Sequence, residues 1–301
     1  MSTARTDWTV LGVPTSAGAH YAGQERAPEA LRATGLLSRL SAAGLDLSDA
    51  GDLPGGLFAV GHYRSAARNL AAVAKVAREV ADAVTQEVSS GRRPLVIGGD
   101  CTITPGVVAG MRRVHPDAGL VYVDGDPDLD PLAPDASGIL DATGIAQLLG
   151  HGEPELTSLA GDVPILSPSR LAIVGCDPRE MLPAYRDFLT SRGISCSEGP
   201  ELTADPEGTA RRALSALADA DAGPLVVHFD VDVVDSADLP LGNFPHYGSG
   251  VRLDDVVRCL RVLVADPSCA ALVLTEVNPT HDPDGGQLER YVGALVSALA
   301  A

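Results

Sequence analysis

The chain has 301 residues, 45% of them hydrophobic, and its 40 acidic and 22 basic side chains give a formal net charge of −18 at pH 7. This composition is typical of a globular protein with a large core. The negative charge repels phosphate backbones and anionic lipid, which disfavours a role on nucleic acid or at a membrane surface.

Cysteine usage and the N-terminal sequence predict the compartment. The five cysteines are odd in number and show no CxxC spacing, which argues against a disulfide scaffold and for a reducing environment. The segment MSTARTDWTV lacks the apolar core of a signal peptide, and no apolar stretch reaches the roughly 20 residues of a membrane span. We therefore expect a cytoplasmic protein.

Apolar runs typical of buried strands alternate with helical patterns along the chain. The runs begin at Thr9, Pro94, Gly119, Arg170, Pro224 and Ala270. Sequence patterns, chiefly apolar residues at helical spacing, predict helices over residues 28–40, 65–90, 205–220, 253–264 and 287–300. No linker or internal repeat divides the sequence. We expect one α/β domain over residues 1–301, with a single doubly wound, mainly parallel sheet flanked by helices.

Aspartates close three of the apolar runs, at places where a binding site is expected. The runs read LVIGGD, LVYVDGDPDLD and LVVHFDVDVVD. Ligands bind at the carboxyl ends of strands in a parallel sheet, and the long loops 125–139 and 235–251 follow two of these runs. Side chains two residues apart on an extended strand share a face, so we expect two sets to converge. The sets are Asp124, Asp126 and Asp128, and Asp230 and Asp232.

Carboxylates gathered in one crevice need a source of positive charge. Two carboxylates about 4 Å apart repel each other by roughly 4 kcal/mol at an effective dielectric constant near 20. A bound divalent cation would offset that repulsion, and this is our leading interpretation of the clusters. The alternative is that each aspartate caps a turn or a helix after its strand.

Five motifs in the same order resemble the arginase/agmatinase (ureohydrolase) family over nearly the whole chain. LGVPTSAGAHYAGQERAPEALR is similar to that family's opening strand, loop and helix. GGDCTITPG is similar to GGDHSxxxG, VDGDPDLD to DAHxD, HFDVDVVD to SxDxDxxDP, and TEVNP to EVNP. The segment ASGILDATGIAQLLG resembles the family's SGNxHGxP. The resemblance implies an arginase-type three-layer α/β/α fold.

The resemblance also implies a chemistry, namely hydrolysis of guanidino compounds to urea and an amine at two bridged Mn²⁺ ions. The positions that match the ligands of the first ion are Cys101, Asp124, Asp128 and Asp230. Those that match the ligands of the second ion are Asp124, Asp126, Asp230 and Asp232. Glu276 matches the residue that holds the substrate guanidinium. A homo-oligomer, trimeric or hexameric, is implied as well.

The chain departs from the family pattern where the chemistry is expected. Cys101 and Asp126 stand at the two histidine ligands, and Asp141 stands at the loop histidine that shuttles protons. Asp235-Ser236 replaces the Asp-Pro after the last ligands. The segment GNFPHYGSG, residues 242–250, replaces a Gly-Thr-Gly-rich stretch.

These substitutions leave several interpretations open. A Cys101 thiolate would be a softer ligand that favours Zn²⁺ or Fe²⁺ over Mn²⁺. It would be a nucleophile if a nearby cation lowered its pKa, or simply a small buried side chain. Asp126 can bind a hard cation such as Mg²⁺, but it adds charge, so one ion, two ions or none are all compatible with the sequence. Asp141 would act as an acid or base if its pKa is raised.

Other polar residues near the motifs are candidates for supporting roles. His228 has the strand parity of Asp230 and could compensate for a lost imidazole. His246 could do the same or contact substrate, and Asn243 is a candidate substrate contact. We expect Asp128, Asp141 and Glu276 to take part in catalysis.

The leading hypothesis is a divergent metal-dependent C–N hydrolase that acts on a guanidino, hydroxyguanidino or amidine-like small molecule, with Mn²⁺ as the first candidate ion. The alternative is a non-catalytic protein of the same fold that binds a cationic ligand or pairs with an active subunit.

Overall fold

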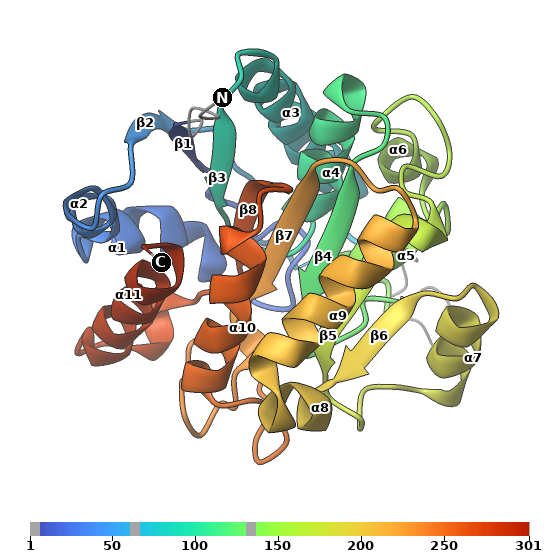
Figure 1. Cartoon of the computed structure of the whole chain (residues 1–301). Helices are drawn as coiled ribbons and strands as arrows, with labels where there is room; N and C mark the ends of the chain where they lie inside the picture. The colour runs from blue at the N-terminus through green and yellow to red at the C-terminus, as the bar shows by residue number, and fades with distance from the viewer. Residues whose placement is uncertain (1–6, 61–66, 131–136, 301) are drawn as a thin grey trace, which may run out of the picture.

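The computed structural model describes residues 7–60, 67–130 and 137–300. Within these residues, eight parallel strands form one sheet with the order β2-β1-β3-β8-β7-β4-β5-β6 (Figure 1). The strands are β1 (Trp8–Gly12), β2 (Leu47–Asp52), β3 (Arg93–Ile97), β4 (Gly119–Val123), β5 (Leu171–Cys176), β6 (Ser195–Glu198), β7 (Leu225–Asp230) and β8 (Cys269–Thr275).

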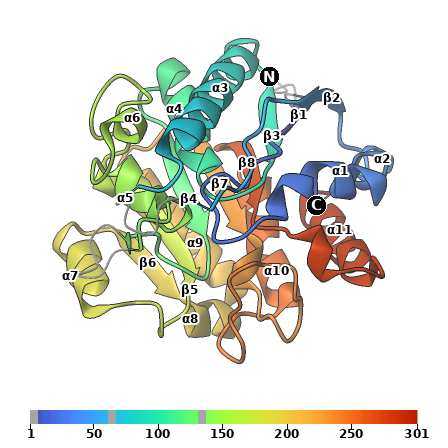
Figure 2. The same cartoon turned by 180° about the vertical axis from the view of Figure 1, so that it is seen from behind.

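Helices cover both faces of the sheet (Figures 1 and 2). One face carries α1 (Ala27–Ala33), α2 (Leu36–Ala42), α8 (Gly199–Ala204), α9 (Pro206–Asp219), α10 (Leu253–Ala265) and α11 (Gly286–Leu299). The other carries α3 (Leu70–Ser89), α4 (Ile103–Val114), α5 (Gly144–Leu148), α6 (Pro154–Thr157) and α7 (Pro183–Ser191). The prediction of a doubly wound parallel sheet is confirmed.

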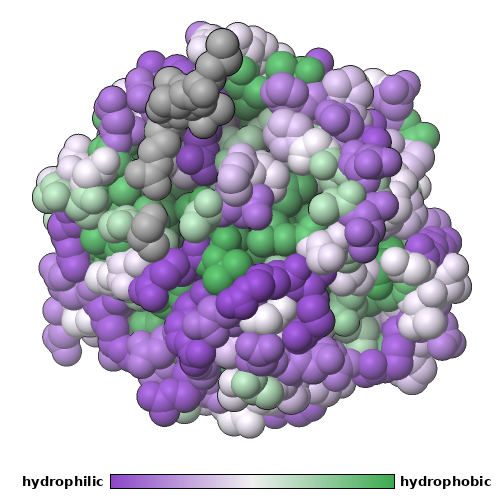
Figure 3. Space-filling model, viewed as in Figure 1, coloured by the Kyte–Doolittle hydropathy of each residue, from purple (hydrophilic) through white to green (hydrophobic). Residues whose placement is uncertain are grey.

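The central strands are largely apolar because both of their faces are buried. In β4, Val121 and Val123 pack into one core and Leu120 and Tyr122 into the other. Alternate side chains of a strand point to opposite faces, so a strand between two helical layers is apolar at most positions on both faces. On the outside, hydrophilic side chains dominate the face seen in Figure 1, with apolar groups in the furrows between them (Figure 3).

The six apolar runs all contain strands, but the two edge strands had no such signal. The edge strands read LSDAGD in β2 and SCSE in β6, and their residues are partly or fully exposed. The helix predicted over residues 28–40 is wrong as one element. It is divided into α1 and α2 at Gly35, whose positive φ of 82° suits glycine because it has no Cβ. The assignment of the whole chain to one domain stays a prediction, because the chain includes residues outside the described ranges.

The order of the strands positions the site. The four neighbouring strands β3, β8, β7 and β4 point their carboxyl ends to one edge of the sheet. Cys101, Glu276, Asp230 and Asp124 lie at or just after these ends. Among the described residues, no helix is long and apolar enough to cross a membrane.

Two glycines let α4 pack closely on α3. A Cβ added to Gly106 would lie 2.5 Å from the carbonyl oxygen of Ala77, and one added to Gly110 would lie 2.6 Å from that of Ala81. Both distances are shorter than van der Waals contact, so any larger residue would push the helices apart. Because α4 follows the loop that carries Cys101, this packing also supports the site.

We expect Gly110→Ala to lower the free energy of unfolding by about 1–3 kcal/mol, because the added methyl group overpacks a backbone contact. Gly293→Ala in α11 is the matched control. There the nearest atom to the added Cβ is the mobile end of Arg39, at 3.2 Å, so alanine should stabilise the helix by up to about 1 kcal/mol. Urea unfolding of both variants checks this. Unchanged or greater stability of Gly110→Ala would show that the two helices separate without cost.

Candidate functional site

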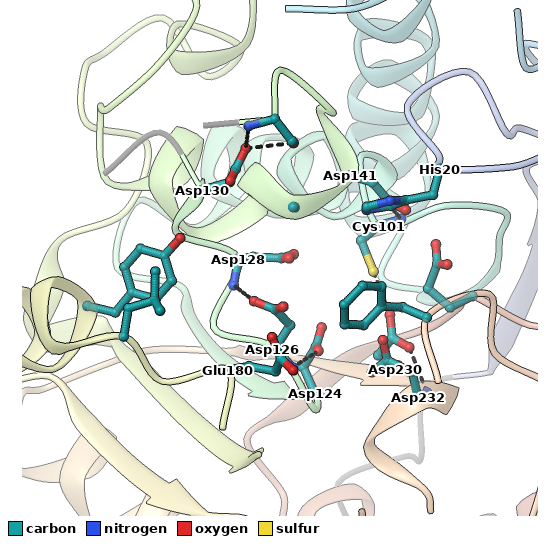
Figure 4. A pocket seen from close by; sticks show the side chains of 16 residues that line it. His20, Cys101, Asp124, Asp126, Asp128, Asp130, Asp141, Glu180, Asp230 and Asp232 are labelled. Atoms are coloured by element: carbon teal, nitrogen blue, oxygen red, sulfur yellow. Dashed lines mark hydrogen bonds between the residues drawn. The ribbon is translucent and has the colours of Figure 1, made fainter. Parts of the chain in front are cut away.

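A cavity of about 230 Å³ opens at the carboxyl ends of the central strands. It is lined by most of the residues that the sequence singled out, and those labelled in Figure 4 surround a common space. These are Cys101, Asp124, Asp126, Asp128, Asp141, Asp230, Asp232 and Glu276. The expected convergence of acidic side chains from separate strands is therefore seen.

The reason for the convergence differs from the expected one. The strand β4 ends at Val123, before any of its aspartates, and Asp128 has a positive φ of 48°. Asp232 likewise lies in a 3-10 turn after β7. The loops therefore bring the carboxylates together, and the expected extended-strand parity does not hold beyond Val123 in β4 or beyond Asp230 in β7.

Turn formation and clustering occur together, although they were posed as alternatives. One oxygen of Asp124 accepts a hydrogen bond from the Asp126 N–H at 2.7 Å, and one oxygen of Asp230 accepts from the Asp232 N–H at 2.8 Å. The other oxygen of Asp124 lies 3.5 Å from His228 Nε2, and that of Asp230 lies 2.6 Å from Cys101 Sγ. Each local turn thus aims its carboxylate into the common site.

Asp100 fits the capping interpretation and does not join the acidic cluster. Its carboxylate accepts hydrogen bonds from the N–H groups of Gly18 at 2.9 Å and Thr102 at 3.2 Å. It fastens the N-terminal loop to the start of α4 and does not line the cavity in the described part of the chain.

Cys101 lies in the wall of the cavity and is held there by two hydrogen bonds. Its N–H donates to Asp141 Oδ1 at 2.7 Å, and its thiol donates to Asp230 Oδ2 at 2.6 Å. Burial, followed by the charge of Asp230 and nearby carboxylates, raises the pKa of the Cys101 thiol well above its usual value. Without a cation the thiol therefore keeps its proton, which disfavours a free thiolate nucleophile.

The pKa values of the clustered carboxyl groups are all raised. Burial raises the pKa of Asp126 to about 7 and that of Asp230 to about 6. Burial and then neighbouring carboxylates raise the pKa of Asp124, Asp128 and Asp232 well above the usual value. Asp128 also accepts a hydrogen bond from the Tyr122 hydroxyl. Near neutral pH such a cluster holds either protons or cations.

His228 reaches the site from beneath the floor of the cavity. It is fully buried and stacks on Tyr122, with ring centroids 3.9 Å apart and an interplanar angle of 4°. Its Nδ1 lies 2.8 Å from Thr104 Oγ1, and its Nε2 lies 3.8 Å from Cys101 Sγ. Burial lowers the pKa of His228 to about 3, so the imidazole is neutral.

Glu276 has a carboxylate oxygen that lacks a partner among the described residues. Its Oε2 accepts from Gln24 Nε2 at 2.8 Å, whereas its buried Oε1 has no hydrogen-bond donor there. The backbone holds it in the left-handed region with φ of 64°, an uncommon conformation for a residue other than glycine. Burial and then the charge of Asp141 raise the pKa of Glu276. Similarly, burial and then Asp100 raise the pKa of Asp141.

His246 and Asn243 lie beside the cavity. His246 Nδ1 is 3.2 Å from Asp177 Oδ2, and its buried Nε2, which has no hydrogen-bond partner in the described chain, is 3.9 Å from Asp232 Oδ2. Asn243 donates to the Tyr21 carbonyl and accepts from Asn278. Neither belongs to the described residues that form the cavity wall, so their substrate contacts stay a prediction.

Sequence reasoning missed a second acidic group beside the first. Asp177 directly follows β5, so the rule applied to the other strand ends could have found it. Burial would raise the pKa of Asp177, but hydrogen bonds from Ser249, Arg179 and His246 lower it. Glu180, in the cavity wall, lies next to it, whereas Phe244 and Gln24 carried no signal in the sequence.

The donor atoms of three residue groups are close enough to share a metal ion. In each group one nitrogen, oxygen or sulfur per residue lies within 4.8 Å of the others. The groups are Cys101, Asp124, His228 and Asp230; Cys101, Asp141 and Glu276; and Asp177, Glu180 and His246. The site therefore suits a divalent cation by donor type and by spacing.

Comparison with known proteins agrees with the fold and the motif order. The model of the arginase family matches residues 6–301. The arginase of Bacillus caldovelox is 30% identical over 278 residues, which are 91% of this chain and 91% of that protein. Arginase-1 of Homo sapiens is 27% identical, over 97% of this chain and 91% of that protein.

Solved structures give the same result. The native structure of Bacillus caldovelox arginase at pH 5.6 superposes with a TM-score of 0.88 at 27% identity, covering 99% of both chains. The formiminoglutamase of Trypanosoma cruzi, at 19% identity, shares the fold with a TM-score of 0.76, over 99% of this chain and 95% of that chain. Because the family model spans nearly the whole chain and its relatives align along it, this chain belongs to the arginase family.

Proposed function

We propose that the protein is a metal-dependent hydrolase that cleaves a C–N bond in a guanidino, hydroxyguanidino or amidine group of a small molecule. The observation that carries this proposal is the unpaired Oε1 of Glu276, a buried acceptor beside the cation-binding cluster. A buried carboxylate oxygen without a donor is unfavourable, and the N–H groups of a planar guanidinium would satisfy it.

A divalent ion would be held by Cys101 and the aspartates of the cluster, namely Asp124, Asp126, Asp128, Asp230 and Asp232. When bound, a divalent cation lowers the pKa of water and supplies a nucleophile at neutral pH. Family membership makes Mn²⁺ the first candidate, with Zn²⁺, Fe²⁺ and Mg²⁺ as alternatives. The number of ions is one or two.

The remaining work falls to residues of the chain. Glu276 would hold the guanidinium in place, and the acidic wall, which includes Asp130 and Glu180, favours a cationic substrate over an anionic one. Asp141, which is not among the proposed metal ligands, has a raised pKa and so can carry a proton, whereas Asp128, as a ligand of the ion, would accept a hydrogen bond from the attacking water. We assign to Asp128 the orientation of that water and to Asp141 the delivery of a proton to the leaving amine.

A non-catalytic role is the second candidate, and one observation favours it. Neither of the two histidine ligands of the family motifs is present, and Asp141 replaces the proton-shuttling histidine. A protein that had kept only the Glu276 pocket would still bind a cationic ligand. It would release no urea or amine from any compound.

The test is hydrolysis of a panel of guanidino, hydroxyguanidino and amidine compounds by protein reconstituted with Mn²⁺ and, separately, with Zn²⁺. We expect Glu276→Gln to reduce kcat/KM by about 100-fold, because it removes the charge that faces the guanidinium. Glu289→Gln is the matched control, since Glu289 is exposed on α11 and pairs only with Arg39 in the described structure. Product release indistinguishable from buffer across the panel would refute the proposed hydrolase and support the binding role.

The clustered carboxyl groups also predict how stability depends on pH. In the folded state the pKa of Asp230 is about 6 and that of Asp126 about 7. In the unfolded chain both ionise near pH 3.9, so between about pH 4 and pH 7 the folded state binds more protons. The stability of metal-free protein should therefore fall as pH rises through this window, and a divalent cation should restore it.

Thermal unfolding of chelator-treated protein at several pH values measures this effect. Asp126→Asn should flatten the decline, because it removes one of the groups that must give up a proton. Asp187→Asn, an exposed position on α7, should leave the slope unchanged. Stability that rises steadily from about pH 4 to pH 7 without metal would contradict the prediction.

Two further expectations remain open. Family membership suggests a homo-oligomer, a trimer or hexamer, and the cysteine pattern suggests the cytoplasm. Light scattering after size-exclusion chromatography measures the first.

A further inference from the structure

His228 on β7 brings an imidazole close to Cys101, which stands at the position of a histidine ligand in the family motif. The family motif GGDHSxxxG carries a histidine ligand where this chain has Cys101, and SxDxDxxDP begins with serine where this chain has His228. His228 lies on β7 in the second layer of the site, and its Nε2 comes within 3.8 Å of Cys101 Sγ. The two positions at which this chain differs from the motifs, Cys101 and His228, thus have neighbouring side chains.

We propose that Cys101, Asp124, His228 and Asp230 form one thiolate–imidazole–carboxylate metal site that prefers Zn²⁺, or a similar borderline ion such as Co²⁺, to Mn²⁺. This refines the metal requirement of the proposed function and rests on it for its biological meaning.

The distances between the donor atoms match a tetrahedral site. With Zn–S near 2.3 Å and Zn–N near 2.0 Å, tetrahedral ligands place sulfur and nitrogen about 3.6 Å apart, and nitrogen and oxygen about 3.4 Å apart. Cys101 Sγ is 3.8 Å from His228 Nε2, and His228 Nε2 is 3.5 Å from Asp124 Oδ2. All four donor atoms lie within 4.8 Å of one another.

The distance between Cys101 and Asp230 is too short for two ligands of one ion, because a thiol proton now joins them and the metal would replace that proton. Cys101 Sγ and Asp230 Oδ2 are 2.6 Å apart, shorter than the roughly 3.5 Å between two ligands of one zinc ion. At this distance the thiol proton lies between sulfur and oxygen. Binding of the metal would displace that proton to solvent, leaving a Cys101 thiolate, and would require the Asp230 carboxylate to move back by about 1 Å.

The orientation of the His228 ring places Nε2 on the side of Cys101 and Asp124. Thr104 Oγ1 lies 2.8 Å from Nδ1, and when Nδ1–H donates to it the lone pair of Nε2 points at Cys101 and Asp124. Stacking on Tyr122 holds the plane of the ring. A hydrogen-bond partner on the second ring nitrogen is typical of histidines that bind metals, because it holds the orientation of the ring.

The donor set determines the preferred ion. Sites built from carboxylates suit Mn²⁺ and Mg²⁺, whereas a thiolate beside an imidazole favours Zn²⁺, Co²⁺ and Fe²⁺. The third group of residues, around His246, lacks sulfur and lies on the other side of Asp232. It offers no reason for the same preference.

Cobalt titration of metal-free protein tests the proposal. Co²⁺ should produce a thiolate-to-cobalt charge-transfer band in the near ultraviolet and the intense visible bands of a tetrahedral ion. Cys101→Ser should abolish the charge-transfer band, whereas Cys259→Ser, which alters a buried cysteine in α10, should retain it. Zn²⁺ should displace Co²⁺ in competition, and Mn²⁺ should not.

Substitutions at His228 complete the experiment. His228→Ala should weaken Zn²⁺ binding roughly 100-fold, and Thr104→Val roughly tenfold, while His115→Ala at the end of α4 should have no effect. The double variant Cys101→His/His228→Ser, which restores the family residues, should lose the charge-transfer band and gain affinity for Mn²⁺. Circular dichroism confirms that each variant is folded.

If His228→Ala does not fold, nitrogen-15 NMR of the unaltered protein replaces it. Addition of Zn²⁺ should shift the His228 Nε2 resonance while Nδ1 stays protonated. Absence of a thiolate band, a band that survives Cys101→Ser, or an unshifted His228 each overturns the proposal. Hydrolysis with Mn²⁺ but without the charge-transfer band would overturn this metal site and leave the proposed hydrolase function standing. The charge-transfer band without hydrolysis of any compound would support this metal site and overturn the proposed hydrolase function.

Discussion

The electrostatic repulsion among buried carboxyl groups is the constraint on which the site depends. Among the described residues, nine acidic side chains and one thiol line a small cavity at the carboxyl ends of four neighbouring strands. Burial removes the water that would otherwise screen them, and their pKa values rise as a result. A fold that brings these groups together is stable only when protons or cations share the site, so the binding of positive charge follows from the architecture itself.

Rigid backbone contacts keep the acidic groups in place against that repulsion. The turns after β4 and β7 use one oxygen of Asp124 and one of Asp230 to accept their own loop N–H groups. Asp141 accepts from the Cys101 N–H and so joins a distant loop to the start of α4. Each carboxylate therefore stabilises a loop and presents its second oxygen to the site. One residue type serves both purposes because a carboxylate has two acceptor atoms.

The histidines distinguish this chain from the motifs of its family more than the aspartates do. The aspartates that match the family's ligands are retained, whereas both histidine ligands are replaced. His228 places an imidazole beside Cys101, and His246 directs an unpaired nitrogen towards Asp232. The carboxylates that would hold a cation thus match the family motifs, while the other candidate donors differ from them. Softer ligands alter which ion is bound, and the ion in turn sets the reactivity of its water.

The sequence by itself determined the doubly wound sheet and the identity of the acidic cluster. Short apolar runs that alternate with helical patterns are typical of strands buried on both faces, and ligands bind at the carboxyl edge of such a sheet. It did not reveal the exposed edge strands β2 and β6, whose composition resembles that of loops, or the break at Gly35. Only the tertiary structure showed the contact between His228 and Cys101, the unpaired oxygen of Glu276 and the role of Asp177. These depend on distances between elements far apart in sequence, which periodicity and spacing along one chain do not encode.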